Sequence, residues 1–203
     1  MRKEIKNMSK YELRRFIPNI YQRSIYDINY IDLYYNHNIR VITFDLDDTI
    51  TDLISWIIPN KAKRLFNYLI KLGIKPVILS NASERRVKYF AKKLNADWYR
   101  FKVHKPETSE SWNEVLKHYN ISREQLLHIG NNICDDVYGA HKAYIKVALV
   151  RRNGLSMKLC KGLKTLIRFK GTHSHDICKR LKEEKLFYKY KISKKNDQYY
   201  QLT

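Results

Sequence analysis

The stretch VITFDLDDTIT, Val41–Thr51, runs from an apolar, β-branched segment directly into three aspartates within four positions. Val41–Phe44 predicts a buried β-strand, because β-branched and aromatic residues favour strands and none of these four side chains is charged. Carboxylates this close repel one another, and a hard divalent cation would make their crowding tolerable. Taken alone, the aspartates also fit a solvated acidic turn or a fragment of a calcium-binding loop.

Apolar runs alternate with amphipathic stretches from residue 40 to residue 152. Strands are predicted at 41–44, 76–79, 97–101, 126–129 and 147–150, and helices at 61–72, 82–94, 109–119 and 135–144. In the first helix, apolar residues recur on one face and Gly73 is a suitable C-cap. Parallel strands need crossover connections, and helices must cover both faces of such a sheet. The pattern therefore predicts an α/β fold with a doubly wound, mainly parallel sheet.

In doubly wound sheets, ligands bind beyond the carboxyl ends of the strands. Polar side chains follow four of the predicted strands at these ends, so we expect them to meet at one edge of the sheet. They are Asp45, Asp47 and Asp48 after the first strand, Ser80 and Asn81 after the second, Lys105 after the third, and Asn131, Asp135 and Asp136 after the fourth.

These residue types suit phosphoryl transfer. Mg²⁺ binds a few carboxylates together with water and substrate phosphate oxygens. Asp45 could attack phosphorus and form an aspartyl-phosphate, and Asp47, two residues later on an extended chain, could exchange a proton with the leaving oxygen and then with water. Ser80 and Lys105 would hold the phosphoryl oxygens.

Four motifs occur in order: DLDDT preceded by VITF, then VILSN, then a single lysine in HKP, then GNNICDD. Together they resemble the motifs of the haloacid dehalogenase superfamily of phosphohydrolases over residues 40–152. The resemblance implies a Rossmann-like, three-layer α/β/α fold, Mg²⁺ as cofactor, and Asp45 as nucleophile. It assigns acid–base chemistry to Asp47 and phosphate binding to Ser80 and Lys105. Asn81, next to Ser80, is a further candidate for shaping the phosphate pocket, with an ordinary loop residue as the alternative. The short connections after the first two strands leave no room for a sizeable cap domain.

A narrower likeness rests on FIPNIYQRSIYDI ahead of the first strand, together with SNASERRVKYF and HKP. These segments resemble subfamily IIIA, which includes bacterial and mitochondrial phosphatidylglycerophosphate phosphatases. The resemblance implies a phospholipid substrate, phosphatidylglycerophosphate.

The fourth motif departs from the family pattern, which usually opens Gly-Asp, because here it is Gly130-Asn131. An amide oxygen can still bind Mg²⁺, but without a charge it should bind more weakly. Asp136 matches the second acid of the family, and Asp135 could substitute for it. The expected metal ligands are therefore Asp45, Asp47 and Asn131, with either Asp135 or Asp136.

The chain carries 40 Lys+Arg against 20 Asp+Glu, a formal charge of +20. With 15 basic and 4 acidic side chains, residues 151–203 alone contribute +11. The electrostatic field of so many positive charges attracts polyanions. An alternative cause of the charge is AT-rich coding, which would produce the same amino-acid composition. We expect a basic, aromatic segment at residues 1–39 packing on the core, a phosphatase core at 40–152, and a basic helical extension and tail at 153–203. Amphipathic basic ends suit peripheral contact with an anionic membrane.

No apolar run is long enough to span a membrane, and no secretory signal is evident. The cysteines Cys134, Cys160 and Cys178 form no CxxC pair, which favours reduced thiols. These features predict a cytoplasmic protein, free or peripheral on the inner face of the membrane.

Two other functions remain open. The basic surface permits a phosphatase acting on nucleotides or nucleic-acid ends, although no nucleic-acid module supports it. Asn131 also permits a catalytically weakened protein that binds phosphate or a partner without turnover.

Overall fold

The computed structural model describes residues 5, 7–53, 55–101, 110–151, 172–187 and 198–199. Its strands are β1 (Ile20–Gln22), β2 (Val41–Phe44), β3 (Lys75–Ser80), β4 (Asp97–Arg100), β5 (Leu126–Gly130), β6 (Lys146–Val150) and β7 (Gln198–Tyr199). Its α-helices are α2 (Lys10–Arg14), α3 (Tyr30–Tyr35), α4 (Asn60–Leu72), α5 (Glu84–Leu94), α6 (Glu110–Tyr119), α7 (Gly139–Lys142) and α9 (Thr172–Glu183). Short 3-10 turns, η1 (Ile25–Asp27) and η2 (Arg123–Gln125), and one π-helical turn, η3 (Ile133–Tyr138), complete it.

The strands form one sheet in the order β4-β3-β2-β5-β6-β1-β7. The first six run parallel, and only β7 is antiparallel to its neighbour β1. β2 lies inside the sheet between β3 and β5, and all four of its side chains are buried, as its apolar sequence requires. The acidic stretch that follows β2 therefore begins at the centre of the carboxyl edge.

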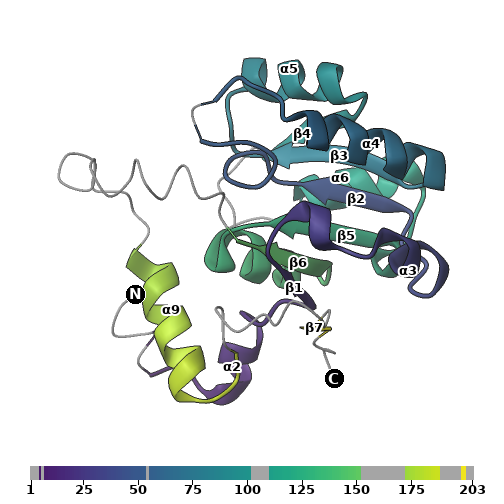
Figure 1. Ribbon diagram of the computed structural model, residues 1–203. Coiled ribbons are helices and arrows are strands. Elements are labelled where there is room, and N and C mark those ends of the chain that lie inside the picture. The colour runs from purple at the N-terminus through teal and green to yellow at the C-terminus, as the bar shows by residue number, and fades with distance from the viewer. Residues whose placement is uncertain are drawn as a thin grey trace.

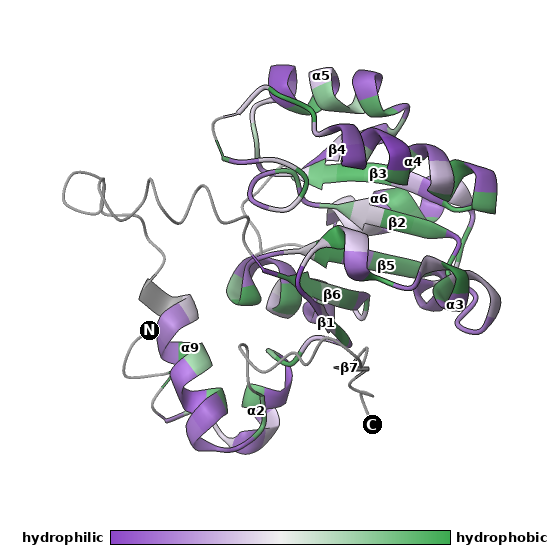
Figure 2. Ribbon diagram, in the orientation of Figure 1, coloured by the Kyte–Doolittle hydropathy of each residue, from purple (hydrophilic) through white to green (hydrophobic). Residues whose placement is uncertain are grey.

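Alternate side chains of the strands enter two hydrophobic cores, one on each face of the sheet. Ile42 and Phe44 of β2 pack in the core beneath α4 and α5, whereas Val41 packs in the opposite core with Trp112 of α6. The central strands are mostly hydrophobic (Figure 2), and α4 and α5 lie together over one side of the sheet (Figure 1). This is the predicted three-layer α/β/α fold with a mainly parallel sheet, and the prediction is confirmed.

Helix α4 shows why the local sequence adopts this structure. Its apolar spacing buries Leu65, Phe66 and Leu69 against the sheet. The helix ends at Gly73, as predicted, where φ is +93°. A Cβ at Gly73 would also lie 3.0 Å from the hydroxyl oxygen of Tyr34, so glycine meets both the backbone and the packing requirement.

Several boundaries differ from the sequence prediction. The helix expected at 135–144 starts earlier, because the Asn132 side chain accepts hydrogen bonds from the N–H groups of Cys134 and Asp135 and caps the first turn. It is also divided into η3 and α7. The helix expected from residue 82 begins at Glu84, and the strand expected at 76–79 extends to Lys75–Ser80. Strand β1, which the sequence did not predict, pairs with β6 inside the sheet.

The N-terminal segment packs against α9 near the other end of the chain. Helix α2 carries a capping box between Ser9 and Glu12, buries Leu13, and contacts α9 (Figure 1). Ile177 and Leu181 of α9 are buried in the same core. The amphipathic stretch at residues 155–169 lies outside the described residues, and the division at residues 39/40 and 152/153 stays a prediction. Among the described helices, none has the length and apolar character needed to cross a bilayer.

Candidate active site

A cavity of about 240 Å³ lies at the carboxyl ends of β2, β3 and β5. Carboxylates and amides from all three strand ends line it. The lining residues are Asp45, Asp47, Asp48, Leu53, Ser80, Asn81, Ala82, Asn131, Asn132, Asp135 and Asp136.

The loop after β2 places two of these carboxylates on the same side. The N–H of Asp45 donates to the carbonyl of Ile129 at 2.8 Å, which extends the pairing with β5 by one residue. Leu46 is fully buried, so its neighbours Asp45 and Asp47 both face the cavity. The turn is closed by Asp48, whose φ is +58° and whose N–H donates to the carbonyl of Thr51 at 2.7 Å. Aspartate is among the residues that tolerate this left-handed conformation.

Arg86 of α5 binds Asp47. Its Nε and Nη2 donate to the same oxygen, Asp47 Oδ1, at 3.1 and 2.8 Å. The guanidinium also donates to the backbone carbonyls of Ser55, at 2.5 Å, and Asp52, at 3.0 Å. Because Arg86 is only 6% exposed, this arrangement is buried, and it fixes the loop that follows the acidic motif.

The role of Arg86 was not predicted from the sequence. The available signal was its position on α5, where it precedes the buried Val87 and lies one turn before the buried Phe90. An arginine on the apolar face of a helix needs an anionic or carbonyl partner, since burying an isolated charge is costly.

The end of β3 contributes Ser80 and Asn81. Ser80 is 2% exposed and lines the cavity, and its hydroxyl accepts a hydrogen bond from the N–H of Ala82 at 3.3 Å. That contact leaves the hydroxyl proton of Ser80 available to donate to an oxygen atom in the cavity.

Asn131 connects the loops after β5 and β2. Its Nδ2 donates to the backbone carbonyl of Asp47 at 2.6 Å and to Thr49 Oγ1 at 3.3 Å. Asn131 is therefore a structural crosslink as well as part of the cavity wall.

Asp136 is held at the base of the cavity, 2% exposed. Its Oδ2 accepts from the N–H of Asn132 at 2.9 Å, and its Oδ1 lies 3.1 Å from Nε2 of the fully buried His128. With Nε2 protonated, His128 donates to Asp136, and its Nδ1 lies 3.0 Å from the hydroxyl of Thr43. The buried His128 therefore orients the Asp136 carboxylate.

The geometry also explains Gly130. A Cβ added there would lie 2.2 Å from the carboxyl carbon of Asp136, which is closer than atoms can approach without displacement. Asp135, by contrast, is half-buried and accepts from Nδ2 of Asn132. Asn132 in turn accepts a hydrogen bond from Ser174 of α9 at 2.9 Å, so this last helix supports the site.

The site's oxygen donors are those that Mg²⁺ prefers. Within the described part of the chain, no three His, Cys, Asp or Glu side chains are grouped closely enough to hold a metal ion alone. Mg²⁺ commonly uses one or two carboxylates and takes its remaining ligands from water and phosphate. The donor set therefore fits Mg²⁺ as an ion shared with a phosphorylated substrate.

The structure gathers Asp45, Asp47, Ser80, Asn81, Asn131, Asp135 and Asp136 around one cavity. Lys105 lies outside the described residues. None of the described residues that line this cavity is a lysine or an arginine, since Arg86 lies behind Asp47.

No protein-family model matches the chain. YqeG of Bacillus subtilis strain 168, named a probable phosphatase, is 31% identical over 130 residues, which cover 63% of this chain and 72% of YqeG.

Solved structures share the general arrangement at low identity. XCC2798 from Xanthomonas campestris is 13% identical with a TM-score of 0.49, covering 81% of this chain and 93% of that one. The cobalt-bound deoxy-D-mannose-octulosonate 8-phosphate phosphatase YrbI from Haemophilus influenzae is 15% identical with a TM-score of 0.44, covering 68% and 97%. The 3-deoxy-D-manno-octulosonate 8-phosphate phosphatase from Moraxella catarrhalis, in complex with magnesium, phosphate and KDO, is 15% identical with a TM-score of 0.43, covering 71% and 98%.

Proposed function

Since this chain belongs to the phosphatases of the haloacid dehalogenase superfamily, we propose that it is a Mg²⁺-dependent phosphomonoesterase that acts through an aspartyl-phosphate on phosphatidylglycerophosphate. The observation that carries the proposal is the pair Asp45 and Asp47, which face one cavity from the end of the central strand, opposite Ser80.

Asp45 is the proposed nucleophile. One of its carboxylate oxygens bonds to phosphorus while the bond from phosphorus to the alcohol oxygen breaks. Its backbone is fixed by pairing to Ile129, so the attacking oxygen starts from a rigid position.

Asp47 is the proposed proton carrier. It gives a proton to the departing alcohol oxygen, and its carboxylate then takes a proton from the water that attacks the aspartyl-phosphate. Inorganic phosphate leaves and the Asp45 carboxylate is regenerated. The Arg86 guanidinium lies 2.8 Å from one oxygen of Asp47, which fixes the position of this carboxyl in both half-reactions.

The phosphoryl oxygens would be held by Ser80, Asn81 and Lys105. The Ser80 hydroxyl at the end of β3 supports this assignment, because it is buried and its proton can be donated into the cavity. Lys105 would add the positive charge that the described cavity wall lacks.

The candidate ligands of Mg²⁺ are Asp45, Asp47 and Asn131, with Asp135 or Asp136; one or two of these carboxylates would bind the ion alongside water and phosphate oxygens. Bound there, the ion would offset the negative charge of the carboxylates and the phosphoryl group. Asp136 has both oxygens engaged by Asn132 and His128, which suits a carboxylate held in one orientation toward a cation. Asp135 is the more exposed of the two, and its carboxylate accepts a hydrogen bond from Nδ2 of Asn132.

The substrate proposal rests on access. Between β2 and α4 the chain has only a loop, and between β3 and β4 only α5, so the described residues contain no inserted cap over the cavity. An open site admits a phosphate on a large or membrane-held molecule. The resemblance to phosphatidylglycerophosphate phosphatases makes that lipid the first substrate to test.

Phosphate release from phosphatidylglycerophosphate in mixed micelles, with and without a chelator, tests the proposal. We expect turnover that stops with chelator, returns with Mg²⁺, and is faster than turnover of soluble sugar phosphates and nucleotides. Equal rates on soluble and lipid substrates would remove the lipid assignment while leaving the phosphatase intact.

The hydrogen bond from Asn131 to the Asp47 carbonyl favours one alternative, a protein that binds phosphate without turnover, because the amide nitrogen faces an atom next to the expected metal site. Titration with Mg²⁺ separates the two. A protein whose melting temperature and phosphate affinity ignore millimolar Mg²⁺ would be the binding form.

A further inference from the structure

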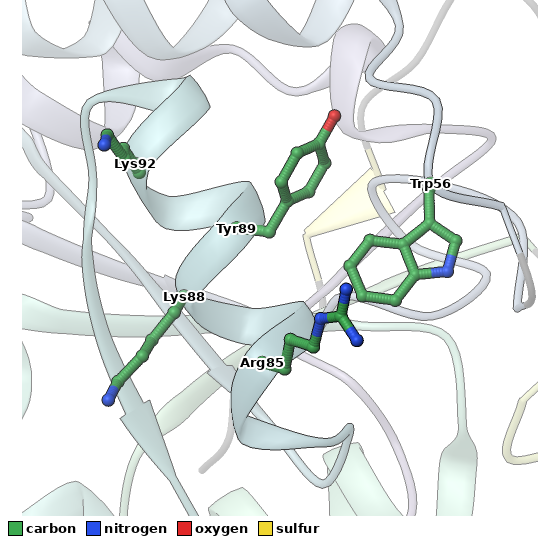
Figure 3. Close-up of a pocket in the computed structure, with 5 residues that line it drawn as sticks. All are labelled: Trp56, Arg85, Lys88, Tyr89 and Lys92. Atoms are coloured by element: carbon green, nitrogen blue, oxygen red, sulfur yellow. The ribbon is translucent and has the colours of Figure 1, made fainter.

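A groove of about 480 Å³ lies beside the candidate site, between the loop before α4 and the outer side of α5. Trp56 faces the groove from the loop, and Arg85, Lys88, Tyr89 and Lys92 project from α5 (Figure 3). The groove combines two aromatic rings with three cations, and none of its lining residues belongs to the proposed catalytic set.

Large apolar side chains remain in water on the loop that lines this groove. Trp56 is 45% exposed and packs edge-on against Tyr89, with ring centroids 5.4 Å apart. The next residue, Ile57, is 76% exposed, and Leu53 on the same loop is 37% exposed. Exposed apolar groups that gather in one place, rather than singly, mark an interaction surface.

The charge on this surface is mainly positive. Arg85, Lys88 and Lys92 follow one another at three- and four-residue intervals along α5, so they share a side of the helix. Glu84 is the one acid of α5, and its ion pair with Lys88 at 2.6 Å lowers the pKa of its carboxyl. The Arg85 guanidinium lies 5.9 Å from the centre of the Trp56 ring.

The groove and the catalytic cavity share a wall. Leu53 lines the cavity, and Trp56, three residues later, lines the groove. Arg86 holds this loop by its bond to the Ser55 carbonyl, lies 5.6 Å from the Trp56 ring, and binds Asp47 on its other side. A surface seated on the groove would therefore lie next to the mouth of the cavity.

We propose that the groove, together with Ile57, is a docking surface for an anionic lipid bilayer. Aromatic and aliphatic side chains would enter the headgroup region while the α5 cations pair with lipid phosphates. This inference rests on the proposed function in one respect. The groove would hold the membrane surface from which a membrane-held phosphomonoester reaches the catalytic cavity.

Nucleic acid fits the same groove less well. Single strands bind by stacking bases on open aromatic faces, and the Trp56 ring already has the guanidinium groups of Arg85 and Arg86 beside it. Contact with a phosphate backbone would bury little of the apolar surface of Ile57, whereas insertion into a bilayer interface would remove that surface from water.

Vesicle flotation tests the proposal with the full chain. We expect binding to phosphatidylcholine vesicles that contain about 30% phosphatidylglycerol, and little binding to pure phosphatidylcholine. Arg85→Gln/Lys92→Gln should lower the partition coefficient about 30-fold, because two basic side chains leave the surface. Ile57→Ser should lower it about tenfold.

Matched variants carry the same chemical changes elsewhere. Arg14→Gln/Lys117→Gln removes one exposed arginine and one exposed lysine from α2 and α6, which pack on the other core. Ile31→Ser removes an isoleucine that is 54% exposed on α3. Both should bind vesicles as the unaltered protein does, and thermal melting checks that every variant is folded.

Three results would overturn the docking surface: no binding of the unaltered protein to anionic vesicles, equal losses in the groove and control variants, or groove-dependent binding to single-stranded DNA in preference to vesicles. Flotation requires no turnover. Phosphate release from a soluble phosphomonoester, measured in parallel, reports separately on the proposed catalytic function.

Discussion

Arg86 binds Asp47 through two hydrogen bonds to a single carboxylate oxygen. Its Nε and Nη2 donate to Asp47 Oδ1 at 3.1 and 2.8 Å. Asp47 is 39 residues earlier in the chain, on the loop after the central strand, so only the fold brings the two together. The pair places a positive charge directly behind an acidic cluster. It also joins the loop after β2 to α5, the helix that carries the proposed membrane-docking surface.

Replacing Arg86 by alanine should destabilise the protein by about 2–3 kcal/mol. Removing one partner of a fully buried ion pair costs about 3–5 kcal/mol, and solvent contact of Asp47 reduces that figure. Urea unfolding measures the change. Arg85→Ala, at the exposed neighbouring position, should stay within about 0.5 kcal/mol of the unaltered protein.

The double variant Arg86→Ala/Asp47→Asn isolates the interaction. If the pair carries the effect, the double variant should be more stable than the sum of the single losses implies, because the uncompensated carboxylate has been neutralised. Strict additivity would show that Arg86 acts only through the Ser55 and Asp52 carbonyls.

Asp45→Asn should lower kcat by at least about a thousandfold, since the amide cannot attack phosphorus. The melting temperature should hold or rise, because one charge leaves a crowded acidic cluster. Asp48→Asn is the matched control: asparagine also tolerates a positive φ, so activity should stay within about a factor of three. Retained turnover in Asp45→Asn would exclude it as the nucleophile.

Gly130→Ala should unfold or distort the site, because the new methyl group would overlap the Asp136 carboxylate. Overpacking of this kind costs about 1–3 kcal/mol. Thermal melting and phosphatase activity should both fall. Gly130→Ala/Asp136→Ala should recover stability relative to Gly130→Ala but not activity, and a double variant less stable than either single one would contradict this packing account.

Asn131→Asp should tighten Mg²⁺ binding about tenfold, since a charged oxygen replaces a neutral amide. Without Mg²⁺, the same variant should melt at a lower temperature, because a carboxylate there would face the Asp47 carbonyl in place of a donating amide. The Mg²⁺ dependence of activity and of the melting temperature measures both effects. A variant equally stable with and without the ion would place the metal elsewhere.

The sequence by itself predicted the layers of the fold and the set of polar residues at the strand ends. Strand β2 and helix α4 can be predicted from the sequence, because the spacing of their apolar residues is a local property of successive side chains. The order of the motifs along the chain was sufficient to expect Asp45, Ser80 and Asn131 at one edge, because parallel strands end on the same side.

Tertiary structure decided which side chains support these residues. The supporting contacts join residues that are separated along the chain: they involve Arg86, His128 and the unpredicted strand β1. The apolar periodicity of one segment does not show which other segment it will contact. Arg86 on the inner face of α5 forms its ion pair with Asp47 only when the loop after β2 packs against that helix. The sequence therefore determined the chemical groups at the strand ends, and the packing between distant segments determined how each group is held, charged and exposed.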